Sequence, residues 1–286
     1  MKKTSIARLS LLGIMVAGLA VAYVHAQFGN GPSKLNTVKI ADDLFVIHND
    51  FVPGNTTALI TNEGVVLVDD KFEVDFPNIV AEVKKLTSQP IKYVINTHHH
   101  GDHSGSNAKM QMLGAQLIAS EQARENMVDA NQPGQPAITF DGHAHLHVGG
   151  KDIDLYHFGR SHTNGDVVVL FPAQRTLAAG DMFTYGDDVP ELIDYSGGGS
   201  AKEWTSTLDS ALQLDFTNVV PGHGNVTNKT EMRKFRDSTL RLKNRVHELI
   251  VQKKTRADIE KVMRAEFHWA DLHVARGLDG AIAEMQ

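Results

Sequence analysis

The sequence of 286 residues contains no cysteine. This absence excludes disulfide cross-links, and it excludes a thiolate as a metal ligand or as a nucleophile. Stability must therefore come from a buried core and from bound ions. Low-complexity tracts and repeats at a solenoid period are also missing, which argues against a repeat protein.

Basic charge is scarce as well. The chain has 28 Lys and Arg against 34 Asp and Glu, a formal net charge of −6. Residues 1–26 hold three of the basic side chains and none of the acidic ones, so removing them takes the net charge to −9. An acidic balance of this size argues against a nucleic-acid partner and leaves a small-molecule substrate as the expected partner.

Long apolar runs are confined to the N-terminus. It opens with the basic residues Lys2, Lys3 and Arg8. Residues 9–22 then form an apolar core, and residues 24–26 (Val-His-Ala) resemble a signal-peptidase cleavage site. The alternative is a membrane anchor, but the core is short for a span of about 20 residues. We expect residues 1–26 to be an export signal, with no stable membrane anchor after cleavage and a periplasmic or secreted location.

The remaining 260 residues, 27–286, fit one domain. Strands are predicted at 38–40, 44–48, 57–60, 65–68, 91–95, 116–119, 143–148, 153–158, 167–170, 176–179 and 219–220. Helices are predicted at 74–86, 103–113, 121–128, 200–212 and 229–252. Two shorter helices complete a helical C-terminal region at about 229–286. Strands and helices mixed in two passes predict an α/β (α+β) protein with two sheets between helical layers.

The most informative feature is the run of six residues from His98 to His103, His-His-His-Gly-Asp-His. It places four metal-ligating side chains in one turn after an apolar strand: His98, His100, Asp102 and His103. Strand alternation sends His98 and His100 to one side and His99 to the other. We expect Gly101 to let the backbone turn sharply so that Asp102 and His103 face them. Two neighbouring metal sites follow from this arrangement.

Four ligands are too few for two ions, so further ligands are expected at later strand ends. Three apolar strands each run into a glycine-flanked turn that carries a polar group. These groups are His162, Asp181 and His223. Glycine lets the backbone pack close to an ion, which makes such turns suitable for ligands.

In this order the residues resemble the metallo-β-lactamase superfamily, and the resemblance extends from about Asp43 to His223. It implies a four-layer αββα sandwich with the site at one edge between the sheets. It implies that one metal is held by His98, His100 and His162, and the other by Asp102, His103 and His223. Asp181 matches the carboxylate that bridges both metals, and Asp69 matches a residue that hydrogen-bonds to ligands.

Asp181 also marks a departure from part of the family. This chain has aspartate at the position where several subclasses of the β-lactamases that it resembles have cysteine. The seven-ligand set is similar to that of family members that cleave thioesters, such as glyoxalase II, or lactones. The resemblance therefore favours a thioester or a lactone and leaves a β-lactam as an alternative substrate.

Two further features carry open interpretations. His143, His145 and His147 alternate on one strand face, but such a run arises by chance about ten times as often as the first motif, so we interpret it as structural rather than as a second metal site. The Gly-rich segment 183–199 follows Asp181; it is either a lid in which Tyr185 contacts substrate or a plain connecting loop.

The predicted function is hydrolysis of a carbonyl substrate by a metal-bound hydroxide, with Asp102 and Asp181 in the reacting centre. Bound metal lowers the pKa of water to about 7, so no protein base is needed. Two divalent ions are expected; zinc suits imidazole and carboxylate best, and iron or manganese would accept the same ligands. Two alternatives remain at this stage: an iron-dependent redox enzyme resembling the persulfide dioxygenases of this fold, and a protein that binds zinc without catalysis.

Overall fold

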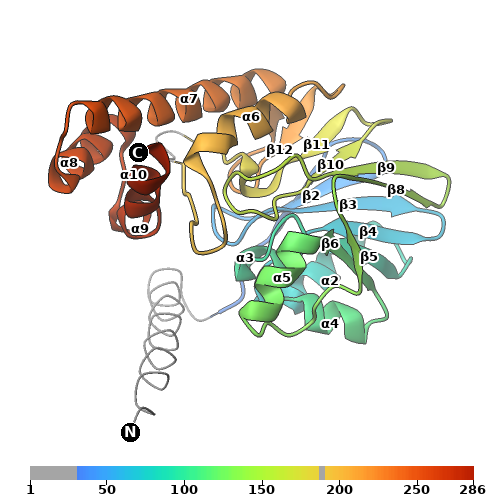
Figure 1. Ribbon diagram of the computed structural model, residues 1–286. Helices are drawn as coiled ribbons and strands as arrows, with labels where there is room; N and C mark the ends of the chain where they lie inside the picture. Colours follow the sequence, from blue (N-terminus) through green and yellow to red (C-terminus); the bar gives the residue numbers. More distant parts are fainter. Residues whose placement is uncertain (1–30, 187–190) are drawn as a thin grey trace, which may run out of the picture. The chain divides into compact units, whose positions relative to one another are not determined.

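Two β-sheets lie face to face in the computed structural model, which describes residues 31–186 and 191–286. The predicted export signal at residues 1–26 lies outside the described residues. Helices cover the outer face of each sheet, as Figure 1 shows. The order of layers is therefore helix, sheet, sheet, helix, the αββα sandwich that the resemblance implied.

The first sheet has seven strands in chain order. They are β1 (Asn36–Lys39), β2 (Leu44–His48), β3 (Thr56–Thr61), β4 (Gly64–Val68), β5 (Ile91–Ile95), β6 (Gln116–Ser120) and β7 (Ile138–Phe140). The first four pair antiparallel and β4 to β7 pair parallel. Because β4 and β5 are parallel neighbours, their carboxyl ends meet at one edge, and the residues after both ends lie side by side.

The second sheet has six strands in the order β13-β12-β11-β10-β9-β8. They are β8 (His143–Val148), β9 (Lys151–Tyr156), β10 (Val168–Phe171), β11 (Thr176–Ala178), β12 (Asn218–Val220) and β13 (Thr227–Asn228). Only β11 and β12 are parallel among these pairs. Their carboxyl ends therefore deliver the segments that carry Asp181 and His223 to the same edge.

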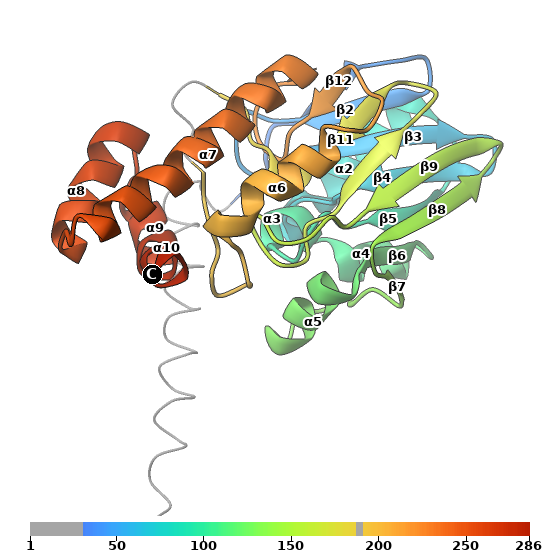
Figure 2. The same cartoon turned by 45° about the horizontal axis from the view of Figure 1, so that its top comes forward.

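Helices pack on both outer faces (Figure 2). On the first sheet lie α2 (Phe76–Leu86), α4 (Asn107–Met112) and α5 (Glu121–Asp129), with the short α3 (Gly101–Ser104) at its edge. On the second lie α6 (Ala201–Ala211) and the long α7 (Lys229–Val251). The chain ends in α8 (Arg256–Phe267), α9 (Asp271–His273), a π-helical turn (Val274–Leu278) and α10 (Asp279–Met285). Among the described residues, no helix combines the length and the apolar character needed to cross a bilayer.

Three apolar clusters hold the layers together. Val66, Ile95 and Val169 belong to the cluster between the two sheets, where strands of both contribute. A second cluster joins α2 and α4 to the first sheet, and a third joins the second sheet to the C-terminal helices. Burial of apolar area stabilises by about 25 cal/mol per Å². The three clusters together connect all four layers of the sandwich.

Most predicted elements are present, but two predictions are wrong. The helix expected at 103–113 is broken into α3 and α4, because the amide of Ser106 donates to the Asp70 carboxylate (3.0 Å) instead of continuing the helix. The carbonyl of Asp102 accepts from the amide of Gly54 (3.2 Å) instead. The connection expected between 128 and 143 contains β7, a three-residue strand too short to show a sequence period.

Candidate metal centre

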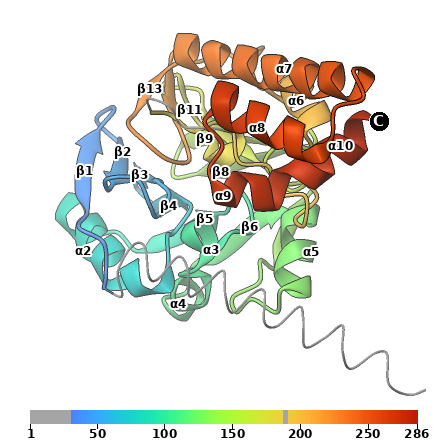
Figure 3. The same cartoon turned by 90° about the vertical axis from the view of Figure 1, so that its left-hand side faces the viewer.

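The seven side chains predicted from the sequence converge on one pocket, although they span residues 98–223. They fall into three overlapping groups whose ligand atoms lie within 4.8 Å of one another: His98/His100/His162, His98/His103/Asp181 and Asp102/His103/His223. Figure 3 shows the edge of the sandwich from the side of α3 and the C-terminal helices. The groups share members, so the arrangement is one pocket with two adjacent centres.

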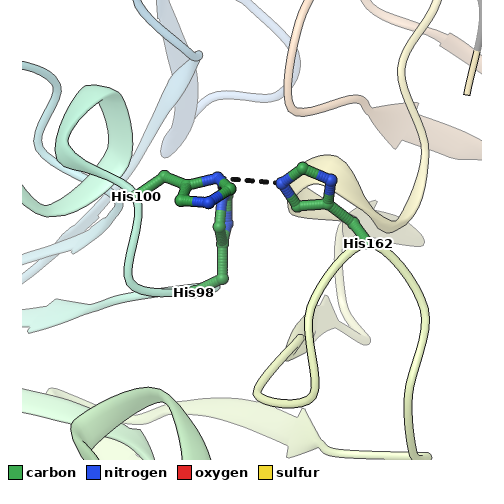
Figure 4. Close-up of side chains that lie close together, drawn as sticks. All are labelled: His98, His100 and His162. Atoms are coloured by element: carbon green, nitrogen blue, oxygen red, sulfur yellow. Dashed lines mark hydrogen bonds between the residues drawn. The ribbon is translucent and has the colours of Figure 1, made fainter. Parts of the chain in front are cut away.

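The first centre is made of three imidazoles (Figure 4). Nδ1 of His100 lies 3.2 Å from Nε2 of His98 and 2.9 Å from Nε2 of His162. Nitrogen ligands about 2.1 Å from a tetrahedral ion are separated from one another by about 3.4 Å. The observed separations are close to that spacing, so a small outward shift of the rings would accommodate an ion.

The second centre joins two imidazoles and a carboxylate. Nε2 of His103 lies 3.2 Å from Nε2 of His223, and Oδ2 of Asp102 lies 3.3 Å from the latter nitrogen. Asp181 reaches both centres: its Oδ1 is 3.2 Å from Nε2 of His103, and its Oδ2 is 3.6 Å from Nε2 of His162. Asp181 is thus the carboxylate placed between the two groups of imidazoles.

The far nitrogen of each imidazole faces a hydrogen-bond acceptor. These contacts are His98 Nδ1 to Thr97 Oγ1 (3.1 Å), His100 Nε2 to Asp194 Oδ2 (2.7 Å), His103 Nδ1 to Asp69 Oδ2 (2.8 Å), His162 Nδ1 to the Leu192 carbonyl (2.5 Å) and His223 Nδ1 to the Phe51 carbonyl (2.7 Å). The Thr97 hydroxyl donates its own proton to Asp69 (2.7 Å), so it accepts from His98. Each far nitrogen therefore carries the proton, and each inner nitrogen presents a lone pair.

The inner nitrogens lie at about hydrogen-bond distance from one another, so their lone pairs repel unless a proton or a metal cation lies between them. Oδ1 of Asp181 is buried and makes no hydrogen bond in the described part of the chain, which leaves a further acceptor aimed into the pocket. Imidazole nitrogen and carboxylate oxygen are donors that suit zinc and other divalent first-row metals. The residues therefore fit a pair of divalent ions.

The pKa shifts of the histidines show that the two carboxylates favour positive charge at the second centre. Burial lowers the pKa of His98 well below its ordinary value and lowers that of His162. Burial opposes charge on His223 too, but Asp181 and Asp102 outweigh it and raise its pKa to about 10. The same competition raises the pKa of His103. Without a cation the two carboxylates draw protons onto His103 and His223, so a metal ion replaces those protons when it binds.

Asp69 lies beneath the centre at the end of β4. It is almost fully buried, and its Oδ1 accepts from the amide of Thr97 (2.7 Å) while its Oδ2 accepts from His103. Because Asp69 also accepts from the Thr97 hydroxyl, one carboxylate fixes the tautomer of His103 directly and that of His98 through Thr97. The geometry is that of a residue that supports ligands by hydrogen bonding.

Sequence reasoning did not identify Asp194, which orients His100. Its side chain is buried, and its second oxygen accepts from the hydroxyl of Ser196 (2.5 Å). Hydrogen bonding to His100 opposes the effect of burial and lowers the pKa of Asp194. No spacing signal could have identified it, because it lies 94 residues from His100 in a loop.

The loop between β2 and β3 was missed as well, although it closes one side of the second centre. The Phe51 ring lies 5.1 Å from the His223 ring, and the Gly54 backbone lies directly against the His103 imidazole. Lys71 anchors this loop from inside: its Nζ donates to Asn49 Oδ1 (2.6 Å) and to the Gly54 carbonyl (2.6 Å). Lys71 is fully buried, and burial lowers its pKa to about 7.

Gly101 does not play the role expected of it. It begins α3 and has no positive φ, and a Cβ added there would meet nothing within 4 Å. The turn is made by His100, which is extended (φ −64°, ψ 144°), and by the helical residues after it. Asp102 and His103 reach the pocket through one turn of ordinary helix.

The other polar residues singled out in the sequence lie around the pocket. Nδ1 of His99 lies 3.4 Å from Nδ2 of Asn126 and its Nε2 lies 4.0 Å from Oδ2 of Asp194, so His99 borders the centre of His98 and His100; burial lowers its pKa to about 3. Tyr185 is tied to the site through its backbone, because its amide donates to the His223 carbonyl (2.9 Å). Its side chain lines a cavity of about 290 Å³ with Phe183 and Phe235, outside the metal pocket.

Comparison with known proteins shows which proteins this chain is similar to. The family model described as the metallo-beta-lactamase superfamily matches residues 49–223. The chain is 28% identical over 229 residues to the metallo-beta-lactamase type 2 of Elizabethkingia meningoseptica, covering 77% of this chain and 90% of the relative. It is 26% identical over 204 residues to the metallo-beta-lactamase type 2 of Bacillus cereus, covering 68% and 76% respectively.

Solved structures show the same fold. The metallo-beta-lactamase from Pontibacter korlensis superposes with a TM-score of 0.66 at 22% identity, covering 72% of this chain and 99% of that one. The DIM-1 metallo-beta-lactamase superposes with a TM-score of 0.64 at 19% identity, covering 73% and 98%. Both alignments cover nearly the whole of the compared protein and almost three quarters of this chain.

Proposed function

Because this chain belongs to the metallo-beta-lactamase superfamily and is a metal-dependent hydrolase, we propose that it is an exported enzyme with two divalent ions, zinc in the native state. Its proposed substrates are small molecules with a reactive carbonyl: a cyclic amide such as a β-lactam, a lactone or a thioester. Export is supported by the character of residues 1–26, with the mature chain beginning at Gln27.

The single observation that carries the proposal is the inward orientation of the five lone pairs. We assign His98, His100 and His162 to one ion, and Asp102, His103 and His223 to the other, with Asp181 in contact with both. Ions bound there would supply a hydroxide nucleophile at neutral pH and a Lewis acid for the substrate carbonyl. The hydrogen bonds that the imidazoles donate to Asp69, Asp194 and the carbonyls of Leu192 and Phe51 hold the rings in the tautomers that this chemistry requires.

The two carboxylates, Asp102 and Asp181, have different proposed roles. The side chain of Asp181 is 9% exposed and lies between the centres, whereas that of Asp102 is 21% exposed. Asp102 is therefore the more accessible carboxylate of the two, and its role is to ligate an ion and to orient a water molecule beside it. Burial opposes ionisation of Asp102, but His103 and His223 lower its pKa, so it is ionised at neutral pH and accepts hydrogen bonds. In the overall reaction, water adds across the C–N, C–O or C–S bond of the carbonyl group.

The balance of charge restricts the substrate. Two divalent ions outweigh the two carboxylates, so the pocket suits an anionic substrate or a polarised carbonyl. The matched relatives are named metallo-beta-lactamases, which supports a β-lactam. Aspartate at position 181, in a chain without cysteine, instead supports a lactone or a thioester as the substrate. Tyr185 is proposed to contact substrate; the contact of its amide with the His223 carbonyl supports this, although the residue lines a cavity that includes none of the proposed ligands.

The test is metal analysis combined with a substrate panel. Purified protein is analysed for zinc, iron and manganese, and is then assayed with nitrocefin, a lactone and a thioester. We expect about two zinc ions per chain and cleavage of at least one compound, with turnover abolished in His98→Gln. Full metal occupancy without cleavage of any of the three would refute hydrolysis of these classes. Iron together with oxygen consumption would instead favour a redox enzyme of the same fold.

A further inference from the structure

A second group of metal-ligating side chains lies outside the pocket, on the outer face of the β8–β9 hairpin. His143, His145 and His147 are exposed and alternate along β8, the last strand of its sheet. The side chains between them, such as Leu146, face the core between the sheets. In Figure 2 this hairpin extends away from α6 and α7. The stripe is therefore open to solvent.

Strand pairing adds carboxylates that the sequence pattern did not place. His145 lies opposite Asp154 and His147 opposite Asp152 in the antiparallel register. Nδ1 of His145 is 2.5 Å from Oδ1 of Asp154, and Nδ1 of His147 is 2.7 Å from Oδ1 of Asp152. Directly opposite residues have Cβ atoms about 5 Å apart, so the pairing holds each carboxylate within reach of an imidazole.

Three of these groups are arranged as a chelate. His143, His145 and Asp154 each offer a ligand atom, and all three atoms lie within 4.8 Å of one another. The rings of His143 and His145 are 4.2 Å apart, and His143 is stacked on Tyr156 at 4.2 Å with an interplanar angle of 4°. Stacking on Tyr156 restrains the His143 ring beside the His145 ring. The side chain of Asp154 is only 16% exposed, so its carboxylate is held in place as well.

His147 is different, which makes it a matched comparison. Its ring is 6.0 Å from that of His145 and it is not part of the three-atom group. Its partner Asp152 has a side chain that is 74% exposed. The same residue type on the same face of the same strand thus lies outside the chelating arrangement.

We propose that His143, His145 and Asp154 form a solvent-exposed site for one divalent transition-metal ion of the kind that prefers imidazole, separate from the buried pocket. Two imidazoles and a carboxylate leave coordination positions open to water. Such a set binds copper(II) more tightly than nickel(II) or zinc(II), following the general order of affinities for these ions. This proposal does not depend on the hydrolytic activity.

The test is a copper(II) titration of the full chain after it has been loaded with two equivalents of zinc and freed of zinc that is not held by the pocket. Bound copper is measured by electron paramagnetic resonance, and zinc in the filtrate is measured so that displacement from the pocket is recognised. We expect one copper ion per chain with nitrogen coupling and no release of zinc. His143→Gln and His145→Gln should each weaken copper binding by about 10–100-fold, at least the effect of losing an outer partner of a metal site.

His147→Gln is the matched control, and it should bind copper nearly as well as the natural protein. All three side chains are exposed, so none of the substitutions removes core packing, and an unchanged thermal melting curve verifies the fold. The proposal is overturned if no copper binds without zinc release, if His145→Gln binds as the natural chain does, or if His147→Gln loses as much affinity as the other two. Asp154→Asn provides a further check, because removing the carboxylate charge should also weaken binding.

Discussion

The Oδ2 atom of Asp194 lies 2.7 Å from Nε2 of His100, and this contact joins the segment between β11 and α6 to the turn after β5. It fixes which nitrogen of His100 carries the proton, so that Nδ1 faces His98 and His162. One metal centre therefore depends on a carboxylate that belongs to no recognisable motif.

The first prediction concerns this contact. Asp194→Ala should weaken binding of one of the two metal ions by about 10–100-fold, because His100 loses the partner that fixes its tautomer. Metal content after dialysis against a graded chelator measures the change. Asp194→Asn keeps an acceptor oxygen but no charge, so its metal affinity should lie between that of the natural chain and that of Asp194→Ala. Equal metal affinity in Asp194→Ala and the natural chain would contradict the assigned role.

Metal removal should destabilise the fold. The pocket buries two carboxylates and five inward lone pairs, which repel one another without cations. An ion present at about 1,000 times its dissociation constant stabilises by about 4 kcal/mol, and about 1 kcal/mol shifts the melting temperature by roughly 2–4 °C for a chain of this size. We therefore expect chelation to lower the melting temperature by roughly 8–16 °C, as measured by calorimetry. His98→Gln should melt near the metal-free protein, and chelation should shift it less.

Two glycines offer a matched pair of substitutions. A Cβ at Gly54 would lie 2.2 Å from Cε1 of His103, whereas a Cβ at Gly101 would meet nothing within 4 Å. Gly54→Ala should displace His103 and reduce metal binding at the second centre. Gly101→Ala should leave metal content unchanged, although Gly101 lies within the His98–His103 run. A reversed outcome in metal analysis would show that the loop after β2 does not support this centre.

The buried lysine should contribute to stability in a pH-dependent way. Lys71→Met leaves Asn49 Oδ1 and the Gly54 carbonyl without their donor, and a buried unpaired group costs about 1–3 kcal/mol. Burial lowers the pKa of Lys71 in the folded chain to about 7, below its ordinary value of 10.5. Between these values the unfolded chain binds more protons, so stability from this group rises with pH by up to about 1.4 kcal/mol per unit.

The measurement is chemical denaturation of both proteins between pH 7 and pH 9. The free energy of unfolding of the natural chain should exceed that of Lys71→Met by an amount that grows with pH. A constant difference would mean that Lys71 keeps its ordinary pKa in the fold. Lys85→Met, which removes an exposed ion pair with Glu82, is the control and should change stability by less than about 1 kcal/mol.

Local features of the sequence were sufficient where the physical cause is local. The strands predicted at 57–60 and 65–68 form the hairpin of β3 and β4, because apolar strands flank a turn at Asn62 and Glu63. Helix α8 begins at a complete capping box, in which Thr255 accepts from the amide of Asp258 and the Asp258 side chain accepts in return. At α6, where a helix was predicted at 200–212, only half of a capping box forms. Ser200 caps the Glu203 amide, but the Glu203 side chain pairs with Arg160.

By itself, the sequence determined the alternation of strands and helices and the polar residues at strand ends, because periodicity and turn chemistry act between neighbours in the chain. Tertiary structure alone decided which distant groups meet. It brought Asp194 to His100, Lys71 to the loop after β2, and Asp154 to His145, and it ended α3 when Gly54 took the Asp102 carbonyl as its acceptor. Each of these contacts depends on how the sheets pack and on strand register, which are set by burial of the whole core and leave no periodic signal in the chain.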